Sequence, residues 1–189
     1  MKQPYVEMLN EQLPNRDNSD SKYTLVSLFS GGGGVDIGFR AAGFNVLMAN
    51  EYDKNIAMNY QRNLNYAPVV CDIRSLTSFE KSWYEPTVLV GGFPCVSFSM
   101  SGKRLGTNSP EGQLYKDMIR VICELRPRMF FAENVFGVLN ANDGNALKCI
   151  MRDLYELPYS ISYTKIRMSE YGIPQLRNRV VFVGVREDV

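Results

Sequence analysis

One cysteine and one glutamate have the side chains of this sequence that are best suited, by type and position, to covalent chemistry. Cys95 lies in GGFPCVSFSMSGKR (residues 91–104), directly after an apolar run and before a basic Ser/Gly-rich segment. A free cysteine is most often a small buried hydrophobic residue, but a cysteine at a strand end beside a basic loop is where a nucleophile would lie. Glu133, in AENV, is either an ordinary capping or ion-paired acid or the acid of a thiol–carboxylate pair.

Histidine is absent from the 189 residues, and the four cysteines are far apart in sequence. The absence of histidine excludes a Ser–His or Cys–His nucleophile pair and any histidine-ligated metal site within this chain. No CxxC zinc or redox motif is present either. We therefore predict no metal site, and a reactive cysteine would need activation by a group other than imidazole.

Two arginines near the end of the chain are candidates for supporting this chemistry. The stretch YGIPQLRNRVVFV places Gln175, Arg177 and Arg179 two residues apart. Alternate residues of a strand point to the same face, so the spacing predicts that all three share one face of an extended segment. The arginines are then either a solvated edge or the groups that fix Glu133 and a substrate carbonyl.

A run of four glycines in LVSLFSGGGGVDIGFRAAGF (residues 25–44) predicts a strand, a bare loop and a helix. Such a loop lets a ligand approach the backbone and meet a helix N-terminus. The pattern GxxxxGK[ST] is absent, which excludes a phosphate-binding P-loop. A simple tight turn and a dinucleotide-type site both remain open.

Two acids at the ends of the next predicted strands favour the second interpretation. Glu51 suits a ribose diol, and Asp72 could accept a hydrogen bond from an adenine amine. Together with the glycines they indicate an adenosine-containing cofactor, either NAD or S-adenosylmethionine. Asp36, early in the helix after the glycines, would lie near a pyrophosphate, which favours a cofactor without phosphates.

The elements that must position these residues alternate between short apolar runs and amphipathic segments. We expect strands at 23–29, 45–51, 67–73, 87–94, 128–135, 159–168 and 178–186, and helices at 35–44, 53–64, 113–127 and 145–157. Asp53 would cap the second helix, and Asp143 or Asn145 the last. This order predicts an α/β fold with a mostly parallel sheet and helices on both faces, whose ligands bind beyond the carboxyl ends of the strands.

Composition is that of one globular domain, with 45% hydrophobic and 22% charged residues. The net charge of +1 gives no general argument for nucleic-acid binding. Neither a signal peptide nor a run long enough to span a membrane is apparent, so we expect a cytoplasmic protein without a membrane partner. Residues 1–22 are interpreted as a polar N-terminal leader and residues 23–189 as the folded domain.

Five stretches in order resemble the DNA (cytosine-5) methyltransferases across roughly residues 24 to 186. They are LFSGGGGVDIGF, NEYD with CDI, GGFPCVSFS, AENV and YGIPQLRNRVVFVG. The resemblance implies a Rossmann-like S-adenosylmethionine-dependent methyltransferase. It also implies DNA methylation, as in restriction–modification systems, on double-stranded DNA that contains a target cytosine.

The resemblance further implies a role for each matching residue. S-adenosylmethionine would be bound by Phe29, Ser30, Gly31, Gly33, Gly34, Glu51, Tyr52, Asp72, Ile73, Pro94 and Leu114, with Glu51 on the ribose and Asp72 on the adenine. Cys95 would be the nucleophile and Glu133 would protonate ring nitrogen 3 of cytosine. Arg179 would contact the cytosine carbonyl, and Arg177 would support the site.

Three features depart from the family pattern. Val96 stands where the family often has glutamine, and SPEG (residues 109–112) lacks the usual arginine. The family also continues beyond the arginine strand with a target-recognition region and a final segment, so we expect a catalytic domain that lacks the target-recognition domain. A second polypeptide carrying that region is an expected partner. The alternatives are an inactive fragment that binds cofactor or DNA only, a transfer-RNA cytosine-5 methyltransferase of the same lineage and, more remotely, a nicotinamide dehydrogenase.

Overall fold

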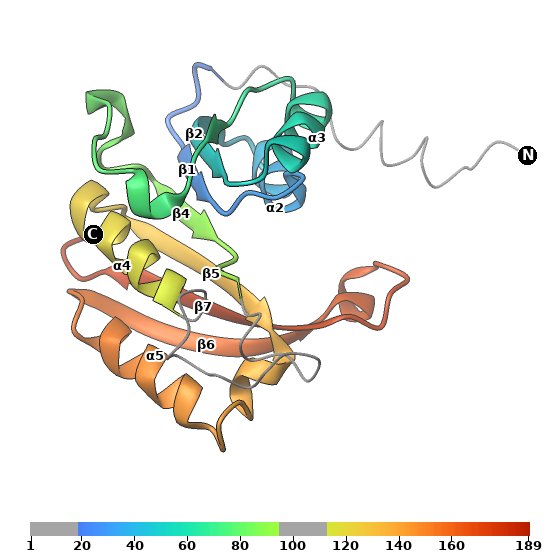
Figure 1. The fold of residues 1–189 in the computed structure, drawn as a ribbon, viewed down its shortest axis with the longest axis vertical. Coiled ribbons are helices and arrows are strands. Elements are labelled where there is room, and N and C mark those ends of the chain that lie inside the picture. Colours follow the sequence, from blue (N-terminus) through green and yellow to red (C-terminus); the bar gives the residue numbers. More distant parts are fainter. Residues whose placement is uncertain (1–18, 95–112) are drawn as a thin grey trace, which may run out of the picture.

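The computed structural model describes residues 19–94 and 113–189, which form a seven-stranded sheet flanked by helices (Figure 1). The strands are β1 (Thr24–Leu28), β2 (Asn45–Glu51), β3 (Val69–Val70), β4 (Val88–Gly91), β5 (Met129–Val135), β6 (Tyr159–Arg167) and β7 (Asn178–Arg186). The helices are α2 (Gly34–Ala41), α3 (Lys54–Leu64), α4 (Leu114–Leu125) and α5 (Asn145–Tyr155), with short 3₁₀ turns η1 (Ile73–Ser75), η2 (Lys81–Trp83), η5 (Phe136–Leu139) and η6 (Met168–Tyr171).

The strand order is β3-β2-β1-β4-β5-β7-β6. The first five strands in this order are parallel to one another, and β7 runs antiparallel to both β5 and β6. The predicted mostly parallel α/β sheet is therefore confirmed. Because β7 runs backwards, its first residues lie beside the carboxyl end of β5, and Arg179 is in register with Val135.

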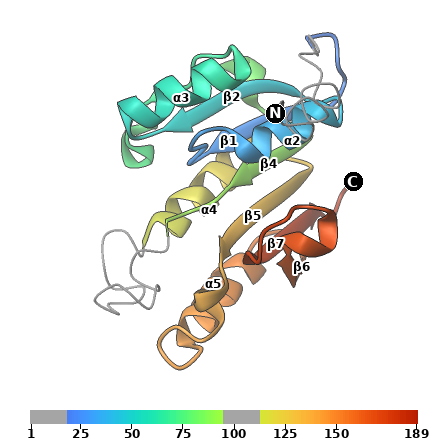
Figure 2. The same cartoon turned by 90° about the vertical axis from the view of Figure 1, so that its right-hand side faces the viewer.

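Two hydrophobic clusters cover the two faces of the sheet. Alternate strand residues point to opposite faces, and here Val26 and Leu89 pack on the side of α4 and α5 while Leu25 and Val88 pack on the side of α2 and α3. Tyr60 of α3 is fully buried in the second cluster. Helices thus cover both faces, as predicted, and the two pairs can be followed in Figure 2.

The capping residues in the sequence predicted the start of α3 correctly but not the start of α5 or the length of β3. Asp53 caps α3 as predicted, because its carboxylate accepts hydrogen bonds from the backbone N–H groups of Asn55 and Ile56 at 2.7 and 3.1 Å. The predicted cap of α5 is wrong: Gly144 occupies that position with φ of 80°, a left-handed conformation that glycine adopts without a steric cost. The third strand is only two residues long, since Asp72 turns the chain into η1.

Two expectations from the sequence bear on the ends and surface of the chain. Residues 1–18 of the proposed leader lie outside the described residues, and the first strand begins at Thr24. In the part of the chain that the structure describes, every helix is too short or too polar to cross a bilayer.

Gly184 of β7 provides a test of the packing between β7 and β5. A Cβ atom at Gly184 would lie 2.1 Å from the Phe130 ring, which is itself fully buried. We expect Gly184→Ala to lower the free energy of unfolding by about 1–3 kcal/mol, because the ring must leave its packed position. Urea unfolding followed by circular dichroism measures this.

Gly38→Ala is the matched control for Gly184→Ala. Gly38 is in helix α2, and an added Cβ there meets nothing within 4 Å. This substitution should stabilise the protein by about 0.5–1 kcal/mol, since alanine is the better helix former. Equal stabilities of the two variants would contradict the close approach of Phe130 to Gly184.

Candidate active site

A cleft of about 470 Å³ opens at the carboxyl ends of the parallel strands, where the fold class places ligands. Its volume lies in the usual range for small-molecule sites, roughly 300–1,000 Å³. Most of the residues predicted to bind the cofactor line it, although they come from five separate parts of the chain: Phe29, Glu51, Tyr52, Asp72, Ile73, Pro94 and Leu114. Asn50, Asp53, Ile56, Arg74 and Gly92 complete the lining.

The glycine loop is tied to the end of β2. Ser30 donates two hydrogen bonds to the Asn50 carbonyl oxygen, from its backbone N–H at 2.9 Å and from its hydroxyl at 3.1 Å. Phe29, just before it, has φ of 52°, a left-handed conformation that a bulky residue rarely adopts. Such conformations concentrate at functional sites because the surrounding contacts hold them in place.

Gly33 shows why this loop must lack side chains at one position. It has φ of 87°, and an added Cβ would lie 2.2 Å from Leu64 and 3.0 Å from Tyr60. Helix α3 therefore packs directly against the loop. Gly34, the first residue of α2, has open space around it, so the crowding is specific to Gly33.

Glu51 orients its carboxylate through two backbone N–H groups. One oxygen accepts from Gly31 and the other accepts from Asp53, both at 2.9 Å. Each carboxylate oxygen has a second lone pair, so two acceptor positions remain for a diol. Tyr52, the next residue, is 73% exposed and lies along the same cleft.

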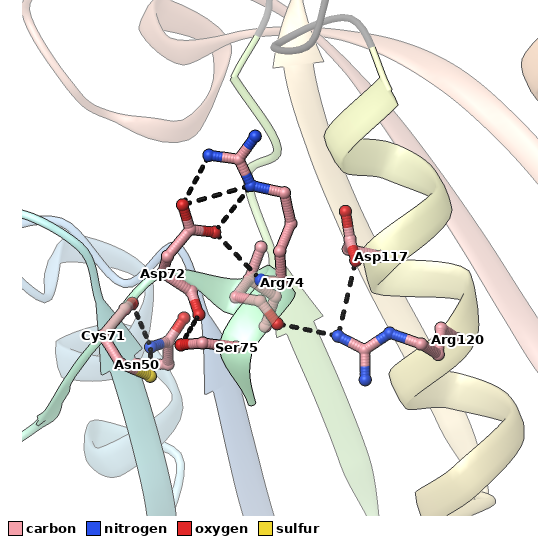
Figure 3. A network of polar contacts seen from close by, with 8 residues as sticks. Asn50, Cys71, Asp72, Arg74, Ser75, Asp117 and Arg120 are labelled. Atoms are coloured by element: carbon pink, nitrogen blue, oxygen red, sulfur yellow. Dashed lines mark hydrogen bonds and ion pairs between the residues drawn. The ribbon is translucent and has the colours of Figure 1, made fainter. Parts of the chain in front are cut away.

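Asp72 forms an ion pair that the sequence did not indicate. Arg74 contacts both carboxylate oxygens, with nitrogen–oxygen distances of 2.9, 3.1 and 2.5 Å, and its backbone N–H adds a bond at 2.9 Å (Figure 3). These hydrogen bonds lower the pKa of Asp72, which keeps it ionised. They also use most of the roughly four acceptor positions of the carboxylate.

Glu133 lies at the carboxyl end of β5 and pairs with Arg179 of β7. Nε of Arg179 donates to a Glu133 oxygen at 2.5 Å, and the two side chains are 13% and 27% exposed, respectively. Glu133 lines a smaller cavity of about 170 Å³. Phe29 and Gly92 line both cavities, so the Glu133 cavity adjoins the large cleft.

The other predicted catalytic residues are placed differently. Cys95 lies outside the described residues; Pro94, the last described residue before it, lines the large cleft. The predicted common face of Gln175, Arg177 and Arg179 is wrong, because β7 begins only at Asn178. The segment around Pro174 turns before the strand starts, so the backbone N–H of Arg177 donates to the carbonyl oxygen of Gln175. Arg177 itself is exposed.

Comparison with known proteins identifies this arrangement. Residues 23–189 match the family model described as C-5 cytosine-specific DNA methylase. The chain belongs to this family.

Relatives and a solved structure agree with this membership. The Type II methyltransferase M.FnuDI of Fusobacterium nucleatum is 39% identical, over 87% of this chain and 47% of its own length. The Type II methyltransferase M.AquIA of Picosynechococcus is 40% identical, over 86% and 71%. A crystal structure assigned to an E. coli prophage DNA modification methyltransferase matches with a TM-score of 0.73 and 29% identity, over 88% and 47%. The chain spans about half the length of most of the curated relatives that it matches.

Asp36 is a buried acid of this C-5 cytosine methylase domain. From the sequence, it was expected only to disfavour a pyrophosphate. It is 1% exposed, and its two oxygens accept from the Ser27 hydroxyl at 2.8 Å and the Tyr60 hydroxyl at 2.6 Å. Burial raises its pKa to about 6, and the two hydrogen bonds oppose that shift. The three residues join β1, α2 and α3 behind the glycine loop, and two of them, Ser27 and Asp36, line the Glu133 cavity.

Asp36 should make stability depend on pH between about 4 and 6. The folded state holds a proton there that the unfolded chain, with a pKa near 3.8, has released. The free energy of unfolding therefore falls as the pH rises through this window, by roughly 3 kcal/mol in total. Asp36→Asn should remove this fall, so the stability of the variant relative to wild type should increase from pH 4 to pH 7.

Urea unfolding at several pH values measures the difference between Asp36→Asn and wild type. Asp72→Asn is a suitable control, because the pKa of Asp72 is lowered and its contribution changes only at more acidic pH. A pH-independent difference between wild type and Asp36→Asn would show that Asp36 does not titrate in this range.

Proposed function

We propose that this chain is the S-adenosylmethionine-binding catalytic domain of a DNA (cytosine-5) methyltransferase, with Cys95 as its nucleophile. The observation that carries the proposal is the position of Glu133. Its carboxylate is held by Arg179 at the end of β5, in a cavity that adjoins the predicted cofactor cleft through Phe29 and Gly92. A group that acts on the base would thus lie next to the cleft that holds the methyl donor.

The large cleft offers the apolar surface and the hydrogen-bond acceptors that an adenosine with a cationic tail requires. Ile73, Leu114 and Pro94 offer apolar surface for a purine ring, and Glu51 has acceptor positions for the ribose diol. The acceptor position that Arg74 leaves on Asp72 is available to the adenine amine. S-adenosylmethionine supplies an electrophilic methyl group on a sulfonium sulfur when it is bound.

The charges of the cleft favour this cofactor over NAD. Three acids, Glu51, Asp53 and Asp72, line the cleft, and Asp36 lies behind the glycine loop. A pyrophosphate would meet these carboxylates with little compensating positive charge, because Arg74 is already paired with Asp72. A cofactor without phosphates avoids that repulsion.

The chain's own residues would activate the cytosine by addition to its ring. The Cys95 thiolate forms a bond to carbon 6, and the electron pair of the 5,6 double bond makes carbon 5 nucleophilic as Glu133 protonates nitrogen 3. After methylation a base removes the carbon 5 proton, the sulfur–carbon 6 bond breaks and Glu133 takes its proton back. Arg179, paired with Glu133, would also hold the cytosine carbonyl, and Arg177 would support the site from the preceding turn.

Double-stranded DNA is the substrate that we propose, with the cytosine turned out of the helix. A base inside the stack cannot reach the cavity that Glu133 lines, and turning it out costs a few kcal/mol. The net charge of +1 supplies little phosphate attraction. A second polypeptide with the target-recognition region would provide sequence readout in the major groove.

Covalent trapping tests the proposed nucleophile. On a duplex library with 5-fluorocytosine in place of cytosine, and with S-adenosylmethionine present, the wild type should form an adduct that survives denaturing electrophoresis. Fluorine replaces the proton that must leave, so the sulfur–carbon bond cannot break. We expect Cys95→Ser to abolish the adduct, and Cys123→Ser, which changes an exposed cysteine of α4, to leave it unchanged.

The trapped residue is then identified by peptide mass mapping. An adduct that persists in Cys95→Ser, or that maps to another residue, would refute Cys95 as the nucleophile.

Glu133→Gln separates base activation from cofactor binding. The amide cannot supply a proton to nitrogen 3, so transfer of labelled methyl groups to duplex DNA should fall by about 100-fold or more. Affinity for S-adenosylhomocysteine, measured by calorimetry, should stay within about twofold, because Glu133 does not line the large cleft. Glu156→Gln, at the end of α5, serves as the control. If Glu133→Gln lowered the affinity for S-adenosylhomocysteine as much as it lowered methyl transfer, the proposed role of Glu133 in base activation would be refuted.

A further inference from the structure

One arginine joins two walls of the large cleft without lining the cleft itself. Arg120 of α4 donates from its two terminal nitrogens to the carbonyl oxygens of Ile73, at 2.7 Å, and Leu76, at 2.8 Å. Asp117, one turn earlier on α4, lies 3.4 Å from the same guanidinium (Figure 3). Arg120 therefore ties the turn that follows β3 to the side of α4.

The turn after β3 needs such support because the sheet gives it little. Strand β3 pairs with β2 through only Val69 and Val70, followed by one backbone bond from Cys71 to Glu51. The Asn50 side chain of β2 adds bonds to the carbonyl oxygens of Val69 and Cys71, but these bonds end before the turn at Asp72. Asp72 and Ile73, which line the cleft, come directly after that short strand. Ile73 and Leu76 are buried, so their side chains anchor the turn, but the bonds from Arg120 hold its backbone.

Helix α4, to which Arg120 belongs, also reaches the cleft. Helix α4 begins at Leu114, which lines the same cavity as Asp72 and Ile73. Since a helix is rigid over two turns, fixing the η1 turn to Arg120 sets its position relative to Leu114. The guanidinium is planar and presents separate donors, so one side chain reaches both carbonyl groups.

We propose that Arg120 is a positioning residue for adenine recognition, which acts by fixing the Asp72–Leu76 turn against α4. The proposal rests on the proposed function of the cleft, and it concerns the base of the cofactor only. Asp72 has little spare acceptor capacity beside Arg74, so a small displacement of the turn would remove the acceptor from the adenine amine.

The test compares two ligands that differ at one group of the purine. S-adenosylhomocysteine carries the amine, and S-inosylhomocysteine carries a carbonyl oxygen at the same ring position. By calorimetric titration of the full chain, we expect wild type to prefer the amine by about tenfold or more, as for a hydrogen bond to a charged acceptor. Arg120→Met should bind S-adenosylhomocysteine about tenfold more weakly and lose most of the preference.

Two further variants and a melting curve keep the result interpretable. Arg120→Lys retains the charge and should restore part of the preference, and it carries the test if Arg120→Met does not fold. Arg128→Met, which changes the residue before β5 and therefore lies at the other end of the sheet, should behave as wild type. A merely structural role would lower the melting temperature and weaken both ligands equally.

Each outcome bears on one of the two proposals. If wild type prefers the amine and a folded Arg120 variant keeps both the affinity and the preference, the positioning role is refuted and the cofactor proposal stands. An equal weakening of both ligands in that variant also refutes it. If wild type binds neither ligand, the cofactor proposal itself fails, and the role of Arg120 fails with it.

Discussion

The ion pair between Arg179 and Glu133 depends on one reversal in the sheet. In the described structure β7 is antiparallel to β5, so a residue near the start of β7 reaches the carboxyl end of β5. A parallel strand in that place would carry Arg179 to the opposite end of the sheet, far from Glu133. The Arg179 Nε and Glu133 oxygen are 2.5 Å apart, both side chains are mostly covered, and Glu133 lines a cavity next to the large cleft.

Backbone N–H groups position the acid and the loop at the centre of the large cleft. Glu51 is oriented by the N–H groups of Gly31 and Asp53, and the loop that supplies the first of these is fastened to Asn50 by Ser30. Because Gly33 lies against Tyr60 and Leu64, the loop cannot move toward α3. The acid that would hold the ribose and the loop that would approach the cofactor are therefore positioned by one connected set of contacts.

Hydrogen-bonded polar side chains around the cleft complete the site. Asp36 is buried between two hydroxyl groups that satisfy both its oxygens, so its desolvation is compensated in part. Asp72 is paired with Arg74, and Arg120 fixes the backbone that carries Asp72. Membership of the C-5 cytosine-specific DNA methylase family places these residues in a methyltransferase domain.

The sequence by itself determined the fold class, several strand ends and most of the residues that line the cleft. Apolar alternation, the glycine run and single acids at strand ends are local signals, and β2 and β7 appear within the predicted limits of 45–51 and 178–186. Spacing in sequence did not show that Arg177 would precede the strand, that Arg74 would occupy Asp72 or that Asp36 would be buried. Only the three-dimensional structure decided those facts. Asp36 is buried by residues that meet when β1, α2 and α3 pack, whereas the Asp72–Arg74 pair and the turn before β7 depend on turn conformations that residue spacing does not specify.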